Sequence, residues 1–153
     1  MLMTPQIPTA ADVFLRVQLL RENAVPPERK SLGAAGYDLC ACEDAAIPRG
    51  GRALVDTGVS VAVPDGTYGR IAPRSGLAVR GIGVGAGVVD MDYRGSVRVL
   101  LFNHSDDPEP FRVRAGDRIA QLVLEAIKTP AVRVVDALDA TERGDGGFGS
   151  TGI

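Results

Sequence analysis

The chain has 153 residues, 45% of them hydrophobic and 24% charged, which fits one globular domain that buries roughly two-thirds of the surface of its unfolded chain. A net charge of -2 argues against a stable nucleic-acid partner, because such a partner requires a basic face. No apolar run approaches the roughly 20 residues of a membrane span, so no membrane partner is expected.

The two ends of the chain are predicted to lie outside the folded domain. The first twelve residues lack a basic start followed by an apolar core, so no signal peptide is predicted, and residues 1–12 are expected to be a disordered leader. Residues 13–140 are predicted to form one β-domain, followed by a flexible C-terminal arm over residues 141–153. Cys40 and Cys42 are too few for a zinc site. We interpret them as reduced, incidental thiols of a cytoplasmic protein, or of a nuclear one if the source is eukaryotic.

Alternation of apolar and polar residues predicts strands through most of the chain. Turn signals recur about every eight to twelve residues, a spacing typical of a sandwich or barrel. The one helix expected is short and follows Pro73, through Leu77 and Val79. Strands are expected over residues 14–20, 59–63, 68–72, 97–102, 119–124 and 132–135, the second and third joined as a hairpin by the turn at residues 64–66.

Two short segments place polar groups at the ends of predicted elements. Residues 35–39 read Ala-Gly-Tyr-Asp-Leu and begin a strand that carries Asp38, which is either a site residue or an ordinary surface carboxylate. Residues 73–78 read Pro-Arg-Ser-Gly-Leu-Ala and lie at a strand-to-helix junction. The unpaired N–H groups and partly positive end of a helix suit an anion beside Arg74 and Ser75. A simple helix cap is the alternative.

Residues 83–95 combine alternate glycines with two carboxylates. The glycines remove side chains from one face of a strand, so a flat, base-sized ligand could lie against the backbone there. Tight packing or a bulge is the alternative explanation. Asp90 and Asp92 would project to the same side if the strand continues and would raise each other's proton affinity, which suits a base acting on water. Alternatively, the two carboxylates flank a turn.

Residues 116–122 place an amide inside an apolar strand. Alternation puts Gln121 on the same face as Ile119 and Val123, so it is either a satisfied core amide or a site residue. The tail at residues 143–152 contains five glycines, an arginine, two hydroxyls and one aromatic ring. Glycine loses the most backbone entropy on ordering, so this tail is expected to order only around a phosphorylated base. A Walker phosphate loop is excluded, because the tail has no lysine and no following helix.

Five segments in this order resemble the five motifs of the homotrimeric deoxyuridine triphosphatases (dUTPases): residues 35–39, 73–78, 87–95, 116–122 and 143–152. The resemblance spans residues 34–152. It implies an all-β fold, a jelly-roll-like β-sandwich of the dUTPase/β-clip type with one short helix, assembled as a homotrimer whose active sites are shared between subunits. It also implies hydrolysis of dUTP to dUMP and pyrophosphate, which limits uracil incorporation into DNA and supplies dUMP for dTMP synthesis.

The resemblance also implies roles for individual residues. Asp90 would activate the water that attacks the α-phosphorus, and Tyr93 would pack on deoxyribose and reject a 2′-hydroxyl. Mg²⁺ would bind the substrate phosphates directly, with Asp38 and Gln121 reaching it through water. The backbone of residues 84–99 would read the edge of uracil and leave no room for a 5-methyl group. The substrate-binding set implied is Arg74, Ser75, Gly76, Gly87, Val89, Tyr93, Gln121, Arg143, Phe148, Gly149, Ser150 and Thr151.

Within the tail, Arg143, Ser150 and Thr151 match groups on the β- and γ-phosphates, and Phe148 matches the ring that covers uracil. The chain departs from some bacterial members at Val84, where they carry asparagine, so base reading would fall to the backbone. Two other functions are alternatives to the dUTPase hypothesis. The related dCTP deaminases share the fold but lack the Asp-x-Asp-Tyr turn and the stacking tail. A catalytically silent trimer is disfavoured, because a scaffold needs no arginine or aromatic ring in a mobile tail.

Overall fold

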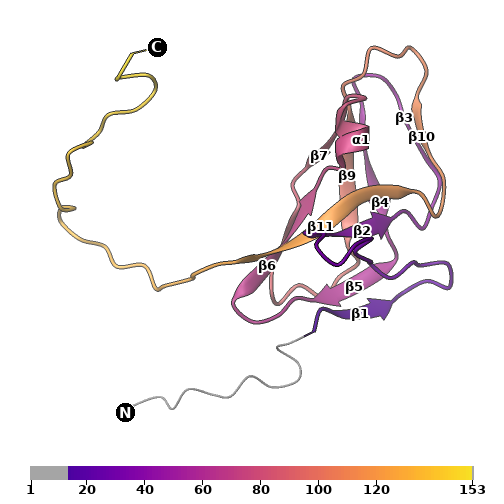
Figure 1. Cartoon of the computed structure of the whole chain (residues 1–153), viewed down its shortest axis with the longest axis horizontal. Coiled ribbons are helices and arrows are strands. Elements are labelled where there is room, and N and C mark those ends of the chain that lie inside the picture. Colours follow the sequence, from indigo (N-terminus) through magenta and orange to yellow (C-terminus); the bar gives the residue numbers. More distant parts are fainter. Residues whose placement is uncertain (1–13, 153) are drawn as a thin grey trace.

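The computed structural model describes residues 14–152, which form a β-sandwich with one short helix, as predicted (Figure 1). The predicted leader lies outside the described residues. Within residues 14–152, no helix is long and apolar enough to cross a membrane. The elements are β1 (Arg16–Leu19), β2 (Gly36–Cys40), β3 (Ala45–Ile47), β4 (Arg52–Asp56), β5 (Val59–Ala62), β6 (Thr67–Ala72), α1 (Ser75–Ala78), β7 (Ile82–Gly85), β8 (Val88–Val89), β9 (Arg98–Asn103), β10 (Phe111–Val113) and β11 (Arg118–Ala126).

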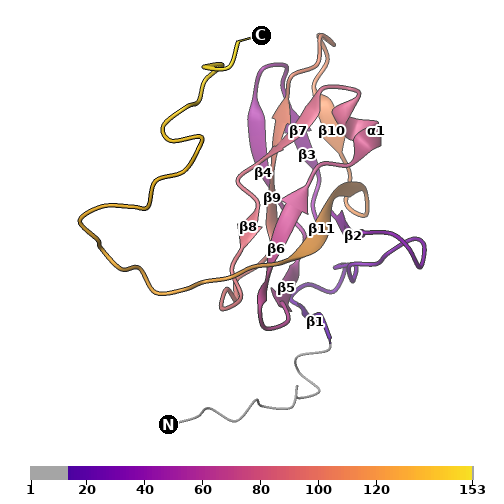
Figure 2. The ribbon, with the colours of Figure 1, turned by 60° about the vertical axis from the view of Figure 1, so that its left-hand side comes forward.

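The strands form two main antiparallel sheets. One has the order β2-β11-β6-β8 and the other the order β4-β9-β7. Two smaller pairs, β1 with β5 and β10 with β3, extend the sandwich at its ends. In Figure 2, β6, β8 and β11 lie in front of β4 and β9, so the two main sheets are separate layers. The long strand β11 lies between β2 and β6 and joins them.

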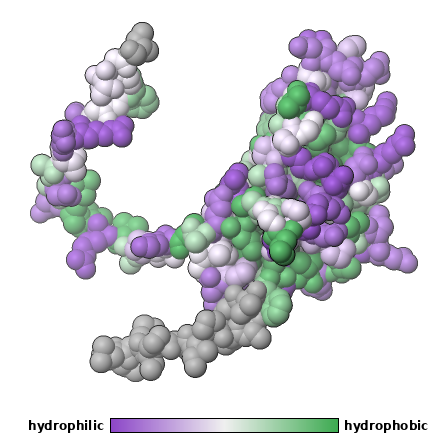
Figure 3. Space-filling view, viewed as in Figure 1, coloured by the Kyte–Doolittle hydropathy of each residue, from purple (hydrophilic) through white to green (hydrophobic). Residues whose placement is uncertain are grey.

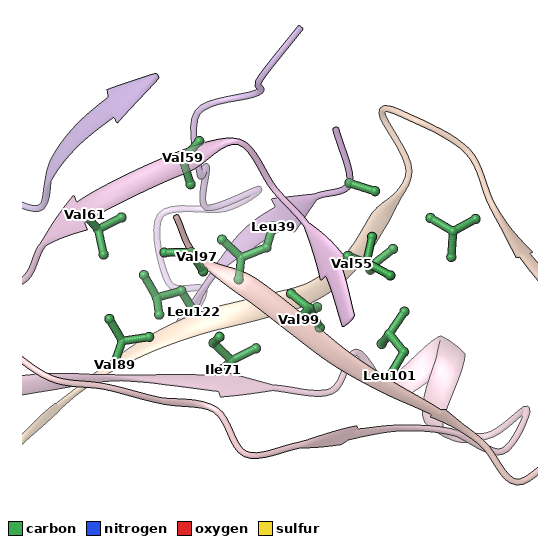
Figure 4. Packing of buried hydrophobic residues seen from close by; sticks show 14 of the residues in the cluster. Leu39, Val55, Val59, Val61, Ile71, Val89, Val97, Val99, Leu101 and Leu122 are labelled. Carbon is green, nitrogen blue, oxygen red and sulfur yellow. The ribbon is translucent and has the colours of Figure 1, made fainter. Parts of the chain in front are cut away.

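Buried aliphatic side chains from both sheets fill the space between the layers (Figure 4). Leu39 and Leu122 come from the four-stranded sheet, and Val55 and Leu101 from the other; each is at most 1% exposed. The alternation predicted for residues 97–102 is confirmed, because the odd-numbered residues of β9 are buried while Arg98 is exposed. Burial of apolar area at about 25 cal/mol per Å² is the main force that holds such a sandwich together.

The predicted hairpin between residues 59–63 and 68–72 is wrong in its pairing. The turn itself forms, with the Thr67 N–H donating to the Pro64 carbonyl at 3.2 Å. However, β5 pairs with β1, whereas β6 pairs with β11 and β8. The turn therefore carries the chain from one sheet to another. Turn residues report that the chain reverses, but they do not report which strands then pair.

The strand predicted at residues 132–135 is also wrong. After β11 ends at Ala126, the chain leaves the body as an extended segment without strand pairing up to residue 152 (Figure 1). Val132 and Val134 are 93% and 92% exposed, and apolar and polar side chains lie along this segment in Figure 3. Alternation marks a strand only where a neighbouring strand is available, and none pairs with this segment within residues 14–152. The departure from the body begins upstream of residue 141.

The core assignment leads to a stability prediction. Replacing Leu122, which is fully buried, by alanine is expected to lower the free energy of unfolding by about 2–5 kcal/mol, because it removes buried apolar contacts and leaves a cavity. Replacing Leu32, which is 92% exposed, by alanine should change it by no more than about 0.5 kcal/mol. Urea denaturation at one fixed protein concentration measures both values. Equal losses in the two variants would contradict the assigned core.

Candidate active site

Three adjacent strands place Asp38, Gln121 and Ala72 in one row. Gln121 of β11 is opposite Asp38 of β2 on one side and opposite Ala72 of β6 on the other. Side chains of directly paired residues lie on the same face of a sheet. Since the neighbouring Leu39 and Leu122 point into the core, Asp38 and Gln121 lie on the opposite face. Beyond Ala72, the chain continues directly into residues 73–78, so segments far apart in sequence meet here.

A bulge in β11 decides where Gln121 points. The register shifts between Arg118 and Ala120, so Ile119 is an extra residue on this strand. Ile119 is 2% exposed and belongs to the core, whereas the half-buried Gln121 faces away from the core. The predicted common face of these two residues is therefore wrong, and the core-amide alternative fails with it. The Gln121 amide Nε2 donates to the Pro73 carbonyl at 3.0 Å.

Gly36 makes room for the Gln121 side chain. A Cβ atom at residue 36 would overlap the Gln121 amide oxygen and would lie 2.8 Å from its amide carbon. Any other residue would therefore push the amide away from the Pro73 carbonyl. The glycine of the segment at residues 35–39 is required by this close approach, and Asp38 follows it on the same strand at the position opposite Gln121.

Two guanidinium groups hold the Asp38 carboxylate. The Arg74 Nε lies 3.6 Å from Oδ1, and an Arg118 terminal nitrogen lies 3.3 Å from Oδ2. Arg74 also donates to the Arg118 carbonyl at 2.8 Å. One carboxylate beside two guanidiniums leaves an excess of positive charge, and both arginines border a cavity of about 950 Å³. This group, Asp38, Arg74 and Arg118, is called the arginine cluster below.

The arginine cluster lies at the start of α1. Arg74 occupies the N-cap position with an extended ψ of 135°, and no side chain caps the helix. A capping role for this segment is therefore not observed, and Ser75 and Gly76 follow Arg74 as the first two residues of α1. Guanidiniums and backbone N–H groups bind phosphate oxygens well. Sequence reasoning did not assign a role to Arg118, although this residue lies within the segment that contains Gln121.

The two cysteines behave as structural residues. Both are free and buried, and burial is the largest cause that raises the pKa of each thiol; the Asp38 carboxylate adds to this for Cys40, and the Asp56 carboxylate for Cys42. They therefore stay protonated at neutral pH and are poor metal ligands or nucleophiles. Among the described residues, no group of three or more His, Cys, Asp or Glu side chains could hold a metal ion.

A second group of predicted site residues lies on the turn after β8. The strand ends at Val89, and the Tyr93 N–H donates to the Asp90 carbonyl at 3.1 Å. The strand therefore does not continue through Asp92, and the turn alternative for these two carboxylates is correct. Gly87, Val89, Asp90 and Tyr93 all border one cavity of about 430 Å³. We call residues 90–93 the carboxylate turn.

Packing within the chain explains two of the alternate glycines. A Cβ atom at Gly85 would overlap the Phe102 ring, and one at Gly87 would lie 2.8 Å from the Ile71 carbonyl oxygen. At Gly83 the nearest atom would be 3.8 Å away, on His104. The tight-packing alternative therefore explains why residues 85 and 87 are glycines, because neighbouring atoms occupy the space that a Cβ would need.

A single chain keeps the arginine cluster and the carboxylate turn apart. Val89, next to Asp90, pairs with Gly69 of β6, whereas Arg74 follows the other end of β6. Five residues at about 3.3 Å each separate the backbone of Gly69 and Arg74 by roughly 17 Å. The Arg74 side chain is also held by Asp38 and by Arg118, away from β8. The structure thus brings each group together internally but does not join them.

The predicted tail residues form a third, separate group. Arg143 Nε donates to the Gly146 carbonyl at 2.9 Å, and the Ser150 N–H donates to the Gly147 carbonyl at 3.0 Å. The Phe148 ring is fully exposed. Arg143, Phe148, Gly149, Ser150 and Thr151 therefore contact one another locally and lie far from the body (Figure 1).

Fold and site together define an all-β sandwich with an arginine cluster, a separate carboxylate turn and an extended arm. A family model described as dUTPase matches residues 22–152. The chain therefore belongs to the dUTPase family.

Similar proteins are known from distant organisms. The deoxyuridine 5'-triphosphate nucleotidohydrolase of Yarrowia lipolytica is 61% identical over 142 residues, covering 91% of this chain and 89% of that protein. The Arabidopsis thaliana protein of the same name is 60% identical over 141 residues, covering 92% and 84%. Among solved structures, the dUTPase of Staphylococcus bacteriophage 80alpha with dUpNHpp has a TM-score of 0.83 and 30% identity, covering 92% of this chain and 99% of that one.

The geometry around Gly36 leads to a prediction about ligand binding. Replacing Gly36 by alanine is expected to displace the Gln121 amide and to weaken binding of the dUTP analogue dUpNHpp about tenfold, the cost of roughly one hydrogen bond to a charged group. Gly33→Ala is the matched control, because a Cβ there would meet no atom within 4 Å. Calorimetric titration of both variants measures the effect. Equal affinities would show that the position of the amide does not matter for binding.

Proposed function

We propose that this protein hydrolyses dUTP to dUMP and pyrophosphate. The observation that carries the proposal is the arginine cluster, built beside Gln121 by three neighbouring strands in a chain of the dUTPase family. Phosphoryl transfer depends mainly on positioning and on neutralising charge. A site that presents two guanidiniums and a helix start suits the phosphates of such a substrate.

Asp90 is the proposed general base. It lies exposed beside the 430 Å³ cavity, where its carboxylate can accept a proton from a water that attacks the α-phosphorus. Such assistance contributes about 10²- to 10⁴-fold to the rate. The proton moves from the water to a carboxylate oxygen of Asp90, and the bond from the α-phosphorus to the bridging oxygen of the β-phosphate breaks. The pyrophosphate leaving group departs with the electron pair of that bond.

Tyr93 and the backbone of residues 87–89 are the proposed selectivity elements. The Tyr93 ring borders the same cavity as Asp90 and Gly87, so it can cover a deoxyribose and exclude a 2′-hydroxyl. A backbone edge offers N–H and C=O groups for uracil, and a base held close against this edge would leave no room for a 5-methyl group. Rejection by steric exclusion does not require tighter uracil binding.

Mg²⁺ is the proposed cofactor, carried by the substrate phosphates. The described residues fit this arrangement better than a resident metal site, because they contain no cluster of three or more metal-ligating side chains. Asp38 and Gln121 share one row and one face. Mg²⁺ usually keeps several water ligands, and the side-chain oxygens of these two residues can accept hydrogen bonds from those waters. When bound, the ion would neutralise phosphate charge. Asp38 would orient its water shell while remaining paired to Arg74 and Arg118.

We propose a homotrimer with active sites shared between subunits. The roughly 17 Å that separates Gly69 from Arg74 along β6 supports this, because a base must lie within hydrogen-bond reach of the attacking water. A cyclic assembly can bring the carboxylate turn of one subunit close to the arginine cluster of the next. The extended segment supports the same proposal, since Val132 and Val134 are exposed among the described residues and could pack against a neighbouring subunit.

The arm would close over the shared site. Arg143 and the hydroxyls of Ser150 and Thr151 would bind the β- and γ-phosphates, and Phe148 would stack on uracil, a contact that contributes about 1–3 kcal/mol. In the free chain these groups face solvent. A segment with five glycines can change shape easily on binding, because each glycine tolerates backbone angles that other residues avoid.

Pyrophosphate release from dUTP in the presence of Mg²⁺ tests the proposed reaction. A dCTP deaminase would instead release ammonia from dCTP, and a silent binding protein would release neither product. Rapid pyrophosphate release from dUTP, with none from dTTP, is the result expected here. Ammonia release from dCTP, or no turnover of either nucleotide, would overturn the proposal.

Replacing Asp90 by asparagine should lower kcat by about 10²- to 10⁴-fold, because the amide cannot accept the proton of the attacking water. The dissociation constant for dUpNHpp should change little, since the side chain keeps its shape. Single-turnover kinetics and calorimetric titration separate the two effects. A large loss of affinity with kcat intact would show that Asp90 binds substrate instead of acting as the base.

Removing residues 143–153 should leave a folded assembly of unchanged size with very low activity, because β11 and all core residues precede the deletion. Circular dichroism, light scattering and pyrophosphate release measure the three properties. Full activity in the truncated protein would show that the arm takes no part in catalysis.

A further inference from the structure

We propose that Asp56 and Ser96 are positioning residues that hold the carboxylate turn and thereby set the discrimination between deoxyribose and ribose. This inference rests on the proposed function. It concerns the connection from β8 to β9, residues 90–97, and the segment at residues 56–60 that packs beneath it. Neither Asp56 nor Ser96 belongs to the five segments that resemble family motifs.

Three side chains from the segment at residues 56–60 bond to this connection. The Ser96 hydroxyl donates to the Asp56 carboxylate. The Thr57 hydroxyl donates to the Val97 carbonyl at 2.6 Å, and the Ser60 hydroxyl donates to the Arg94 carbonyl, also at 2.6 Å. The end of the connection is therefore attached to the sandwich by side chains. Of these bonds, only that between Ser96 and Asp56 joins two side chains.

Asp56 is itself held firmly. It is 8% exposed, and its Oδ1 also accepts the Gly58 N–H at 3.0 Å. Burial raises its pKa, but the hydrogen bonds from Ser96 and Gly58 and the nearby Arg21, 3.5 Å from Oδ2, outweigh burial and lower it. The carboxylate is therefore ionised at neutral pH, and hydrogen bonds to an ionised acceptor are roughly twice as strong as neutral ones.

Ser96 connects the buried Asp56 to Tyr93. The Tyr93 hydroxyl donates to the Ser96 carbonyl at 3.0 Å. The Tyr93 ring lies against Gly95, where a Cβ atom would be 2.7 Å from the ring carbon Cζ. Ser96 is thus bonded through its hydroxyl to Asp56 and through its carbonyl to Tyr93. Tyr93, Ser96 and Asp90 border the same cavity, so a shift of Ser96 moves the ring that would exclude a 2′-hydroxyl.

The test compares kcat/KM for dUTP and for UTP in the full-length protein and in Ser96→Ala. The ratio of the two constants is measured within one sample, so any unfolded fraction cancels. Removing the hydroxyl should lower the preference for dUTP about tenfold, because the ring loses its fixed position. Ser96→Thr, which keeps a hydroxyl, should restore most of the ratio. Asp56→Asn supplies the same measurement if Ser96→Ala does not fold.

A double variant shows whether Asp56 and Ser96 act on the dUTP/UTP ratio through the hydrogen bond between them or independently of each other. The double variant Asp56→Asn with Ser96→Ala should show the same ratio as Ser96→Ala alone. Asp44→Asn is the matched control: Asp44 also accepts a backbone N–H, that of Ala115 at 2.9 Å, and it borders neither the 950 Å³ cavity nor the 430 Å³ cavity. Its ratio should equal that of the wild type.

Two outcomes would overturn the inference in different ways. A wild-type ratio in Ser96→Ala and in Asp56→Asn, with dUTP still preferred, would overturn the positioning role alone. Independent, additive effects of the two substitutions on the ratio would do the same. A wild-type protein that turns over neither nucleotide would overturn the proposed function itself, and the inference with it.

Discussion

The pairing of β11 with both β2 and β6 is the constraint on which the site depends. These two ladders align Asp38, Gln121 and Ala72 in one row. Because the side-chain period of a strand is two, a slip of one residue in either ladder would send Gln121 into the core. The buried Leu122 fixes the register, since it must fill the space between the sheets. The hydrophobic core thus sets the position of polar groups on the opposite face.

The arginine cluster is better understood as a positioning device than as a source of stability. Its side chains keep substantial contact with solvent, with Arg118 46% exposed and Arg74 29%, and ion pairs of that kind stabilise a fold by at most about 1 kcal/mol. Their value lies in geometry. Asp38 keeps both guanidiniums in place without neutralising them fully, so the cluster keeps a net positive charge that suits the proposed phosphate ligand.

Much of the fold could be predicted from the sequence, because its signals are local. The alternation in β9 reports one buried face, and Pro73 marks the start of α1. The failures share one cause, which is that they depend on partners distant in sequence. The turn at residues 64–66 could not show that β5 pairs with β1, and the bulge at Ile119 has no mark in the local pattern. The segment at residues 132–135 alternates like a strand, but it is exposed and pairs with no strand among the described residues.

The site shows the same limit. The residues that resemble family motifs lie in three separate groups in the fold, and no local signal identifies Arg118 as a partner of Asp38 or Ser96 as a partner of Asp56. Those contacts join residues 80 and 40 positions apart. They can be found only when the strands are paired in space.

The central claim is that one active site needs the arginine cluster of one subunit and the carboxylate turn of another. The most direct measurement mixes equal amounts of Arg74→Ala and Asp90→Asn chains by joint refolding, each variant being nearly inactive alone. In a cyclic trimer, every mixed assembly contains one site with both native residues, so recovery of about a quarter of the wild-type activity is predicted. If both groups acted within one chain, no site in the mixture would be complete. Activity no higher than that of the separate variants would therefore contradict the account.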